Sequence, residues 1–126
     1  MFDPETEGIA TEIVDSAFKV HTALGPGLLE SVYEVCMAHE LGTRGIHVGR
    51  QVPVPIVYGG IKLDDGLRLD LLVEDRIIVE LKAVQDILPV HEAQLLTYLK
   101  LTGKRLGFLI NFNSHLIKTG IRRRAL

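Results

Sequence analysis

The alternation of apolar and polar residues along the chain predicts a β-hairpin at its centre. Residues 68–82 read Arg-Leu-Asp-Leu-Leu-Val-Glu-Asp-Arg-Ile-Ile-Val-Glu-Leu-Lys, so two apolar, β-branched-rich runs flank a polar triplet. A turn centred on Asp75 pairs Val73 with Ile77 and leaves alternate side chains on one face. A slip of one residue would bury charges, so this register is strongly favoured. The apolar face is expected to carry Leu69, Leu71, Val73, Ile77, Val79 and Leu81.

The other face of the predicted hairpin carries charges away from the turn. Asp70 is expected opposite Glu80, with Lys82 on the same side. Facing carboxylates about 5 Å apart repel each other, so they need a proton, a cationic partner or a bound cation. Mg²⁺ accepts one or two carboxylates, keeps several waters and binds substrate phosphate. The pattern is typical of a metal-assisted phosphodiester hydrolase, and the alternative is a neutral surface cluster that includes Arg68.

Helical periodicity predicts two helices before the hairpin and one after it. Asp3-Pro4-Glu5 is a typical helix start, and the first helix is expected to continue to about Leu24. Gly25-Pro26-Gly27 ends it. A second helix from Leu28 or Leu29 to about residues 42–45 places Glu30 in its first turn, where the helix dipole favours a carboxylate. The third is expected from about Val90 to Thr102.

The remaining apolar runs predict further strands. Residues 46–58 contain two prolines, which indicate an edge or irregular strand, and residues 64–66 are expected to turn the chain into the hairpin. Residues 105–112 read as a buried strand and residues 116–122 as a last edge strand. A strand that follows a crossover helix normally returns parallel to its sheet. We therefore expect one α/β (α+β) domain over residues 1–126, with a mixed β-sheet flanked by helices in the order ααβββαββ.

Composition indicates the cellular compartment of the protein but does not decide whether it binds nucleic acid. No apolar run approaches the ~20 residues that span a bilayer, the first residues lack a signal-peptide core, and Cys36 is the single cysteine, so a cytoplasmic protein is expected. The net charge of −2 does not indicate strong non-specific nucleic-acid binding. Basic residues nevertheless cluster, and the following are expected to contact nucleic acid: Lys104, Arg105, Arg122, Arg123 and Arg124.

The apolar fraction of 47% is ordinary for a globular protein, but the mean hydropathy of +0.23 is somewhat high and suggests strands buried on both faces or an interface between copies of the chain. The proline-containing strand at residues 51–58 and the short last strand leave weakly guarded sheet edges. Closed two-fold pairing is the commonest way to bury such surface, so a homodimer is expected. It would also bring two sets of basic residues together. The alternative is a monomer with a solvated arginine-rich terminus.

One stretch resembles a known family signature. Gly27-Leu-Leu-Glu30-Ser-Val-Tyr33 is similar to the motif of the small prokaryotic GxxExxY proteins, which are placed in the PD-(D/E)xK nuclease superfamily. The similarity continues through Val20-His21, Asp70 with Glu80-Leu-Lys82, Gln94-x3-Tyr98, and Leu109-Ile-Asn111-Phe112. Leu69 stands where the superfamily name has proline. The resemblance implies a restriction-endonuclease-like fold.

The resemblance also implies roles for individual residues. Asp70 and Glu80 are expected to hold a divalent metal, usually Mg²⁺ (or Mn²⁺), with the Leu81 carbonyl as a further ligand and Glu30 assisting directly or through water. Lys82 is expected to activate the attacking water.

Two residues of the third predicted helix complete the implied site. Gln94 and Tyr98 are expected to orient Lys82 or the scissile phosphate. The leading hypothesis is thus a Mg²⁺-dependent nuclease acting on DNA. The alternatives are a catalytically silent module that binds nucleic acid or a protein partner, and a structural subunit whose hairpin charges pair internally.

Overall fold

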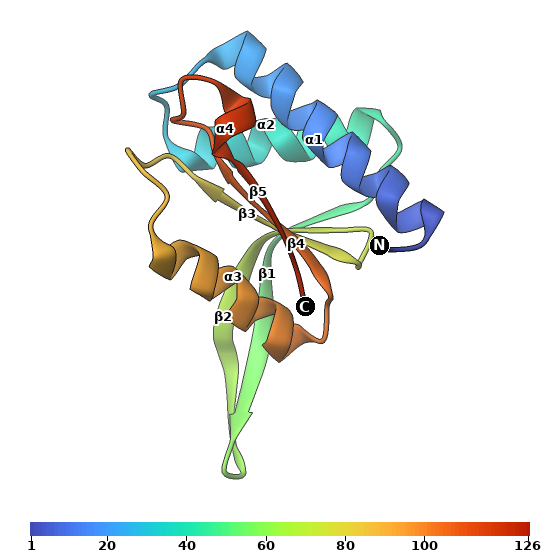
Figure 1. Cartoon of the computed structure of the whole chain (residues 1–126). Helices are drawn as coiled ribbons and strands as arrows, with labels where there is room; N and C mark the ends of the chain where they lie inside the picture. Colours follow the sequence, from blue (N-terminus) through green and yellow to red (C-terminus); the bar gives the residue numbers. More distant parts are fainter.

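Five strands form one mixed sheet in the computed structural model, which describes residues 1–126 (Figure 1). The strands lie in the order β1-β2-β3-β4-β5; β3 and β4 are parallel, and the other neighbours are antiparallel. The predicted mixed sheet and its parallel return after a crossover helix are therefore confirmed. The elements are α1 (Pro4–Leu24), α2 (Glu30–Thr43), β1 (Val48–Tyr58), β2 (Ile61–Val73), β3 (Ile77–Lys82), α3 (Pro89–Thr102), β4 (Leu106–Asn111), α4 (Ile117–Gly120) and β5 (Ile121–Ala125).

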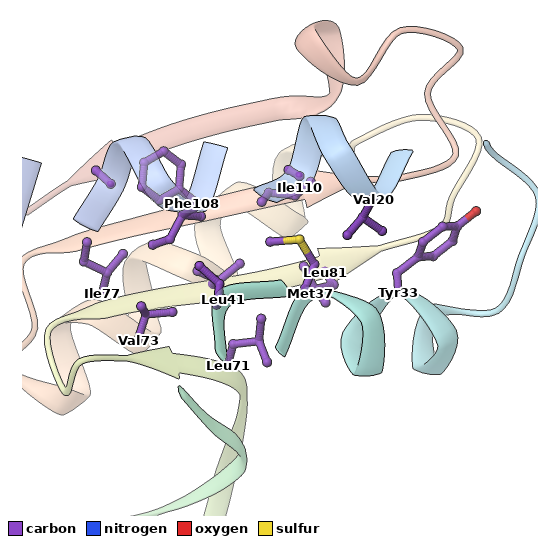
Figure 2. Packing of buried hydrophobic residues seen from close by; sticks show 14 of the residues in the cluster. Val20, Tyr33, Met37, Leu41, Leu71, Val73, Ile77, Leu81, Phe108 and Ile110 are labelled. Carbon is purple, nitrogen blue, oxygen red and sulfur yellow. The ribbon is translucent and has the colours of Figure 1, made fainter. Parts of the chain in front are cut away.

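Helices cover both faces of the sheet. On one face α1 and α2 pack over the strands through the larger of two apolar clusters. Figure 2 shows Val20 of α1 and Tyr33, Met37 and Leu41 of α2 gathered around side chains of the sheet such as Leu81. The hydrophobic effect at this interface is the main reason that the helices lie where they do.

The opposite face of the sheet is covered by α3. Leu95 and Leu99 of this helix pack against Ile78 and Leu109 of the central strands. Gly107 allows the close approach, because a Cβ atom there would lie 2.8 Å from the Leu95 side chain. The crossover helix between β3 and β4 is thus held directly over β4.

The helix ends follow the predicted capping residues. The Asp3 carboxylate accepts a hydrogen bond from Thr6 N (2.9 Å), and Pro4 begins α1. Gly25 and Gly103, both with positive φ, follow α1 and α3. The predicted bounds of these two helices are confirmed to within a residue, and α2 begins at Glu30, one or two residues later than predicted.

The central hairpin has the predicted register at its closed end. Leu71 pairs with Val79 and Val73 with Ile77, and Arg76 N donates to the Val73 carbonyl across the turn. The ladder ends at Leu71, however, so Asp70 is joined to β3 by two bonds between backbone and side chain and not by a ladder pair.

The prediction that Leu69 shares a face with Leu71 is wrong. Leu69 packs with Ile78 under α3, whereas Leu71 packs under α1 and α2. Side chains two residues apart share a face only in a regular strand. The pairing of β1 with β2 lacks Gln51↔Asp70, between Arg50↔Leu71 and Val52↔Leu69, and the side chains of β2 change face at this point.

Two boundaries also differ from the prediction. Residues 64–66 do not separate two strands but lie inside β2, at a register shift where β1 pairing jumps between Val54 and Ile56. The last strand is preceded by the single turn α4 and covers residues 121–125 instead of 116–122. Gly120 ends that turn in close contact, since a Cβ there would lie 2.5 Å from the Asn111 carbonyl.

Candidate active site

Asp70 and Glu80 lie where β2 and β3 stop pairing as a ladder. Each carboxylate bonds the backbone of the other strand: Asp70 Oδ2 accepts from Leu81 N (2.8 Å), and Glu80 Oε2 accepts from Asp70 N (2.9 Å). These reciprocal bonds replace ladder bonds and hold the two side chains side by side. Glu80 is only 5% exposed, and Asp70 is half-buried.

Burial and neighbouring negative charges disfavour the ionised form of both carboxyl groups. Burial, and then the charge of Asp70, raise the pKa of the Glu80 carboxyl to about 8. Burial is also the main cause of the raised pKa of Asp70, with a further contribution from the charge of Glu34. Lys82 opposes both shifts through its positive charge. A bound cation would favour the ionised form of both groups.

The backbone of β3 offers a further oxygen to the same place. The Lys82 carbonyl accepts a hydrogen bond from Phe112 N (2.9 Å) and therefore points toward β4. Successive carbonyls of an extended strand point to opposite sides, so the Leu81 carbonyl points toward β2 and Asp70.

Lys82 and Gln94 line one cavity of about 510 Å³ between the end of β3 and the start of α3. Neither Lys82 nor Glu80 takes part in an ion pair. Tyr98 is half-buried one turn further along α3, and burial followed by the charges of Glu80 and Asp70 raises the pKa of its hydroxyl. The predicted α3 residues therefore lie near the paired carboxylates.

Glu30 reaches the carboxylates from the opposite side. With Asp70 and Leu81 it lines a second cavity, of about 360 Å³. The loop before it is fixed by Tyr33, whose hydroxyl donates to the Gly25 carbonyl (2.6 Å) and accepts from Leu28 N (3.1 Å). Glu30, the first residue of α2, is thus presented by an ordered loop.

Sequence reasoning missed three residues of this second cavity and its rim. Glu34 is a buried carboxylate that accepts hydrogen bonds from Arg50 (3.0 Å) and Gln51 (2.5 Å). Its position four residues after Glu30, on one helix face, was a usable signal. Nothing in the sequence marked Arg50 or Gln51, because their approach to Glu34 depends on the irregular pairing of β1 with β2.

The predicted basic residues are divided between the two faces of the sheet. Arg123 forms a two-point ion pair with Glu7 of α1, whereas Arg124 bonds Glu92 of α3. Lys104 pairs with Asp75, and the Arg105 guanidinium lies over the Phe2 ring.

Of the five basic residues predicted to contact nucleic acid, Arg122 lies in line with Glu80 across the sheet. Glu80 pairs with Leu109, and Leu109 pairs with Arg122. Directly opposed side chains lie on the same face of a sheet, and two strand spacings amount to roughly 10 Å. Arg122 therefore lies in one row with Glu80, on the face that α3 covers.

No three His, Cys, Asp or Glu side chains form a group that could hold a metal ion by themselves. The oxygen donors that converge here are two carboxylates and one carbonyl. Mg²⁺ is commonly bound by one or two carboxylates and keeps several waters, so this donor set suits it.

Comparison with known proteins gives one match, which covers most of the chain. A family model described as the PD-(D/E)XK nuclease superfamily matches residues 7–124, a span that contains Glu30, Asp70, Glu80, Lys82 and Gln94. No curated protein and no solved structure matches the chain.

Proposed function

Because this chain belongs to the PD-(D/E)XK nuclease superfamily, we propose that it is a Mg²⁺-dependent nuclease that hydrolyses phosphodiester bonds of DNA. Membership of the superfamily suggests nuclease activity, whereas DNA as the substrate and Mg²⁺ as the ion are part of the proposal. Gly27, Glu30 and Tyr33 further favour the GxxExxY group within it. The observation that carries the proposal is a buried Glu80 beside Asp70, without a cationic partner.

Asp70, Glu80 and the Leu81 carbonyl would hold the divalent ion, Mg²⁺ or Mn²⁺. Glu30, which lines the same cavity as Asp70, would bind it directly or through water. Burial makes the ionised form of Glu80 costly, and a cation compensates that cost. When bound, the ion stabilises negative charge on the phosphate as a Lewis acid.

Lys82 is the residue that we assign to the attacking water. Its side chain is half-buried, lines a cavity and forms no ion pair, so its ammonium group is available for hydrogen bonding. It would orient the water for in-line attack on phosphorus and favour loss of its proton to solvent by stabilising the hydroxide that forms. The bond from phosphorus to the leaving oxygen breaks as the new bond to the water oxygen forms, and the leaving oxygen takes a proton from solvent.

Gln94, Tyr98 and Arg122 would position the substrate. Gln94 shares the cavity of Lys82, and Tyr98 lies where the charges of both carboxylates reach its hydroxyl. Arg122 lies in the same row of the sheet as Glu80 and has no carboxylate partner, so it can pair with a phosphate.

The test is hydrolysis of linear, nicked, single-stranded and structured DNA with Mg²⁺ and with a chelator. The wild type should cleave at least one substrate with Mg²⁺ only. Lys82→Ala should keep metal binding but lose activity by about 10²-fold or more, as expected for a positioned acid–base group. Lys100→Ala removes an exposed lysine of α3 and should leave activity unchanged.

Two results would redirect the proposal. A fully active Lys82→Ala would remove this lysine from the mechanism. An inactive wild type on all four kinds of DNA would favour the catalytically silent binding module.

A further inference from the structure

Gln51 has a backbone conformation that few residues other than glycine adopt. Its φ is +49°, in the left-handed region. It lies opposite Asp70, between the β1–β2 pairs Arg50↔Leu71 and Val52↔Leu69, where the ladder lacks one pair although the register on either side is the same. Backbone strain at such a position is retained when the surrounding structure imposes it.

The irregularity directs two consecutive side chains toward one carboxylate. In a regular strand, Arg50 and Gln51 would point to opposite faces of the sheet. Here Arg50 donates to Glu34 Oε2 (3.0 Å), and Gln51 Nε2 donates to Glu34 Oε1 (2.5 Å). Both oxygens of this buried carboxylate therefore have a donor, and the Gln51 amide is held in a fixed place.

The fixed amide also reaches the candidate metal ligand. Gln51 Nε2 lies 3.4 Å from Asp70 Oδ1, the oxygen that the backbone of β3 leaves free. A carboxamide has two N–H donors, so it can bridge the two carboxylates. Without this bridge, the like charges of Glu34 and Asp70 would face each other across the cavity of about 360 Å³ that both line.

We propose that Gln51 is a positioning residue, which orients the Asp70 carboxylate for the metal by bridging it to Glu34. The proposal rests on the proposed function, because Asp70 is there a metal ligand. Residues that hold ligands in place commonly change metal affinity by 10–100-fold when they are replaced.

The positioning role and a merely structural role predict different outcomes for Gln51→Asn and Gln51→Gly. Asparagine and glycine accept a positive φ more readily than glutamine, which offsets part of the stability lost with the bond to Glu34, so both variants should remain folded without metal. Both remove the bridge, because the asparagine side chain is one methylene shorter and glycine has none. The Kd for Mg²⁺, measured by calorimetry, should rise by about tenfold or more in both variants.

Gln85→Asn is the matched control. Gln85 is an exposed glutamine of the loop after β3, and its replacement should change neither the thermal midpoint of the metal-free protein nor the Kd. Unchanged Mg²⁺ affinity in both Gln51 variants, with a binding wild type, would overturn this inference alone. A loss of affinity confined to variants whose metal-free form is already unfolded at the titration temperature would also overturn it, because Gln51 would then act only through the fold. A wild type that binds no divalent ion would overturn the proposed function, and this inference with it.

Discussion

Glu80 carries a carboxyl group in a place where water cannot solvate its charge. Its pKa is raised from 4.5 to about 8 by burial and by the charge of Asp70. The folded state therefore binds a proton more tightly than the unfolded chain does. Between about pH 4.5 and pH 8 the folded state holds more protons, so the contribution of Glu80 to stability falls as pH rises. Above pH 8 the full cost of the buried charge is present.

Because the contribution of Glu80 to stability falls as pH rises, replacing it with glutamine should have a pH-dependent effect in the absence of metal. Glutamine can still accept the bond from Asp70 N but has no charge to bury. The free energy of unfolding of the variant, relative to that of wild type, should be higher at pH 9 than at pH 5 by roughly 2–4 kcal/mol, since one pKa unit corresponds to about 1.4 kcal/mol. Urea unfolding with chelator at both pH values measures it. Asp86→Asn, in an exposed loop, is the control, and an equal difference at both pH values would contradict the prediction.

Single residues of the site differ in how far the sequence could reveal them. Glu80 and Lys82 could be placed because they alternate along a strand, and Asp70 because the hairpin register brings it beside Glu80, although side-chain bonds and not a ladder pair join the two. Glu34 and Gln51 were not placed at the site. Gln51 reaches it only through a positive φ and an irregular ladder, and neither is encoded in a local pattern of polar and apolar residues.

At the level of elements, the start of α2 depends on one hydroxyl group. Tyr33 OH bonds the Gly25 carbonyl and Leu28 N, and its ring stacks on Phe112 at 4.5 Å between centroids. Tyr33→Phe should keep the stacking and lose both bonds, which costs about 1–3 kcal/mol in the free energy of unfolding. Chemical denaturation measures this loss.

Tyr58→Phe provides the control for that experiment. Tyr58 lies at the end of β1 with 80% of its surface exposed, so loss of its hydroxyl should leave stability unchanged. Equal effects of the two substitutions would mean that the loop before Glu30 does not depend on Tyr33.

The last strand, β5, gives a matched pair of arginines on opposite faces of the sheet. Arg122 lies on the face of Glu80, whereas Arg123 pairs with Glu7 on the other face. Arg122→Gln should weaken binding of DNA to the metal-free protein and make the salt dependence shallower by about one phosphate contact. Arg123→Gln should leave the slope unchanged. Fluorescence anisotropy over a salt series tests both, and equal slopes for the two variants would contradict the assignment.

The elements with strong local signals were predicted well, and those without them were not. Capping residues and glycines fixed the helix ends, and buried apolar runs fixed β3 and β4. Leu116, Ile117 and Ile121 suggested a strand over residues 116–122, but residues 117–120 form α4, where Gly120 lies too close to the Asn111 carbonyl for a side chain. Such a tertiary contact overrides local propensity and is not visible in the sequence.

Across the whole molecule, the outer part of the β1–β2 hairpin projects beyond the helical layers as an arm (Figure 1). Near its tip Tyr58 pairs with Ile61, and Ile56 with Leu63, so these apolar side chains share one face. Three of them are more than half exposed: Tyr58, Ile61 and Leu63. A two-stranded hairpin without a covering layer is only marginally stable in water, so a second copy that covers this face would stabilise it. The homodimer stays a prediction, and the arm is the surface on which we expect it.

Light scattering at micromolar concentration should give the mass of a dimer. Ile61→Ser combined with Leu63→Ser should give a monomer, because it removes the apolar face of the arm. Leu101→Ser combined with Leu116→Ser replaces two exposed leucines elsewhere and should leave the dimer intact. A monomeric wild type would contradict the prediction.

No helix of the molecule has the length and apolar character to cross a membrane.

The central claim is that Asp70 and Glu80 together form a divalent metal site, and calorimetric titration with Mg²⁺ or Mn²⁺ tests it most directly. Wild type should bind the ion, and Asp70→Asn and Glu80→Gln should each lose most of that binding while remaining folded. Asp86→Asn should bind like wild type, because this exposed loop carboxylate is not one of the proposed ligands. Wild-type affinity in both Asp70→Asn and Glu80→Gln, or no binding by wild type, would contradict the account.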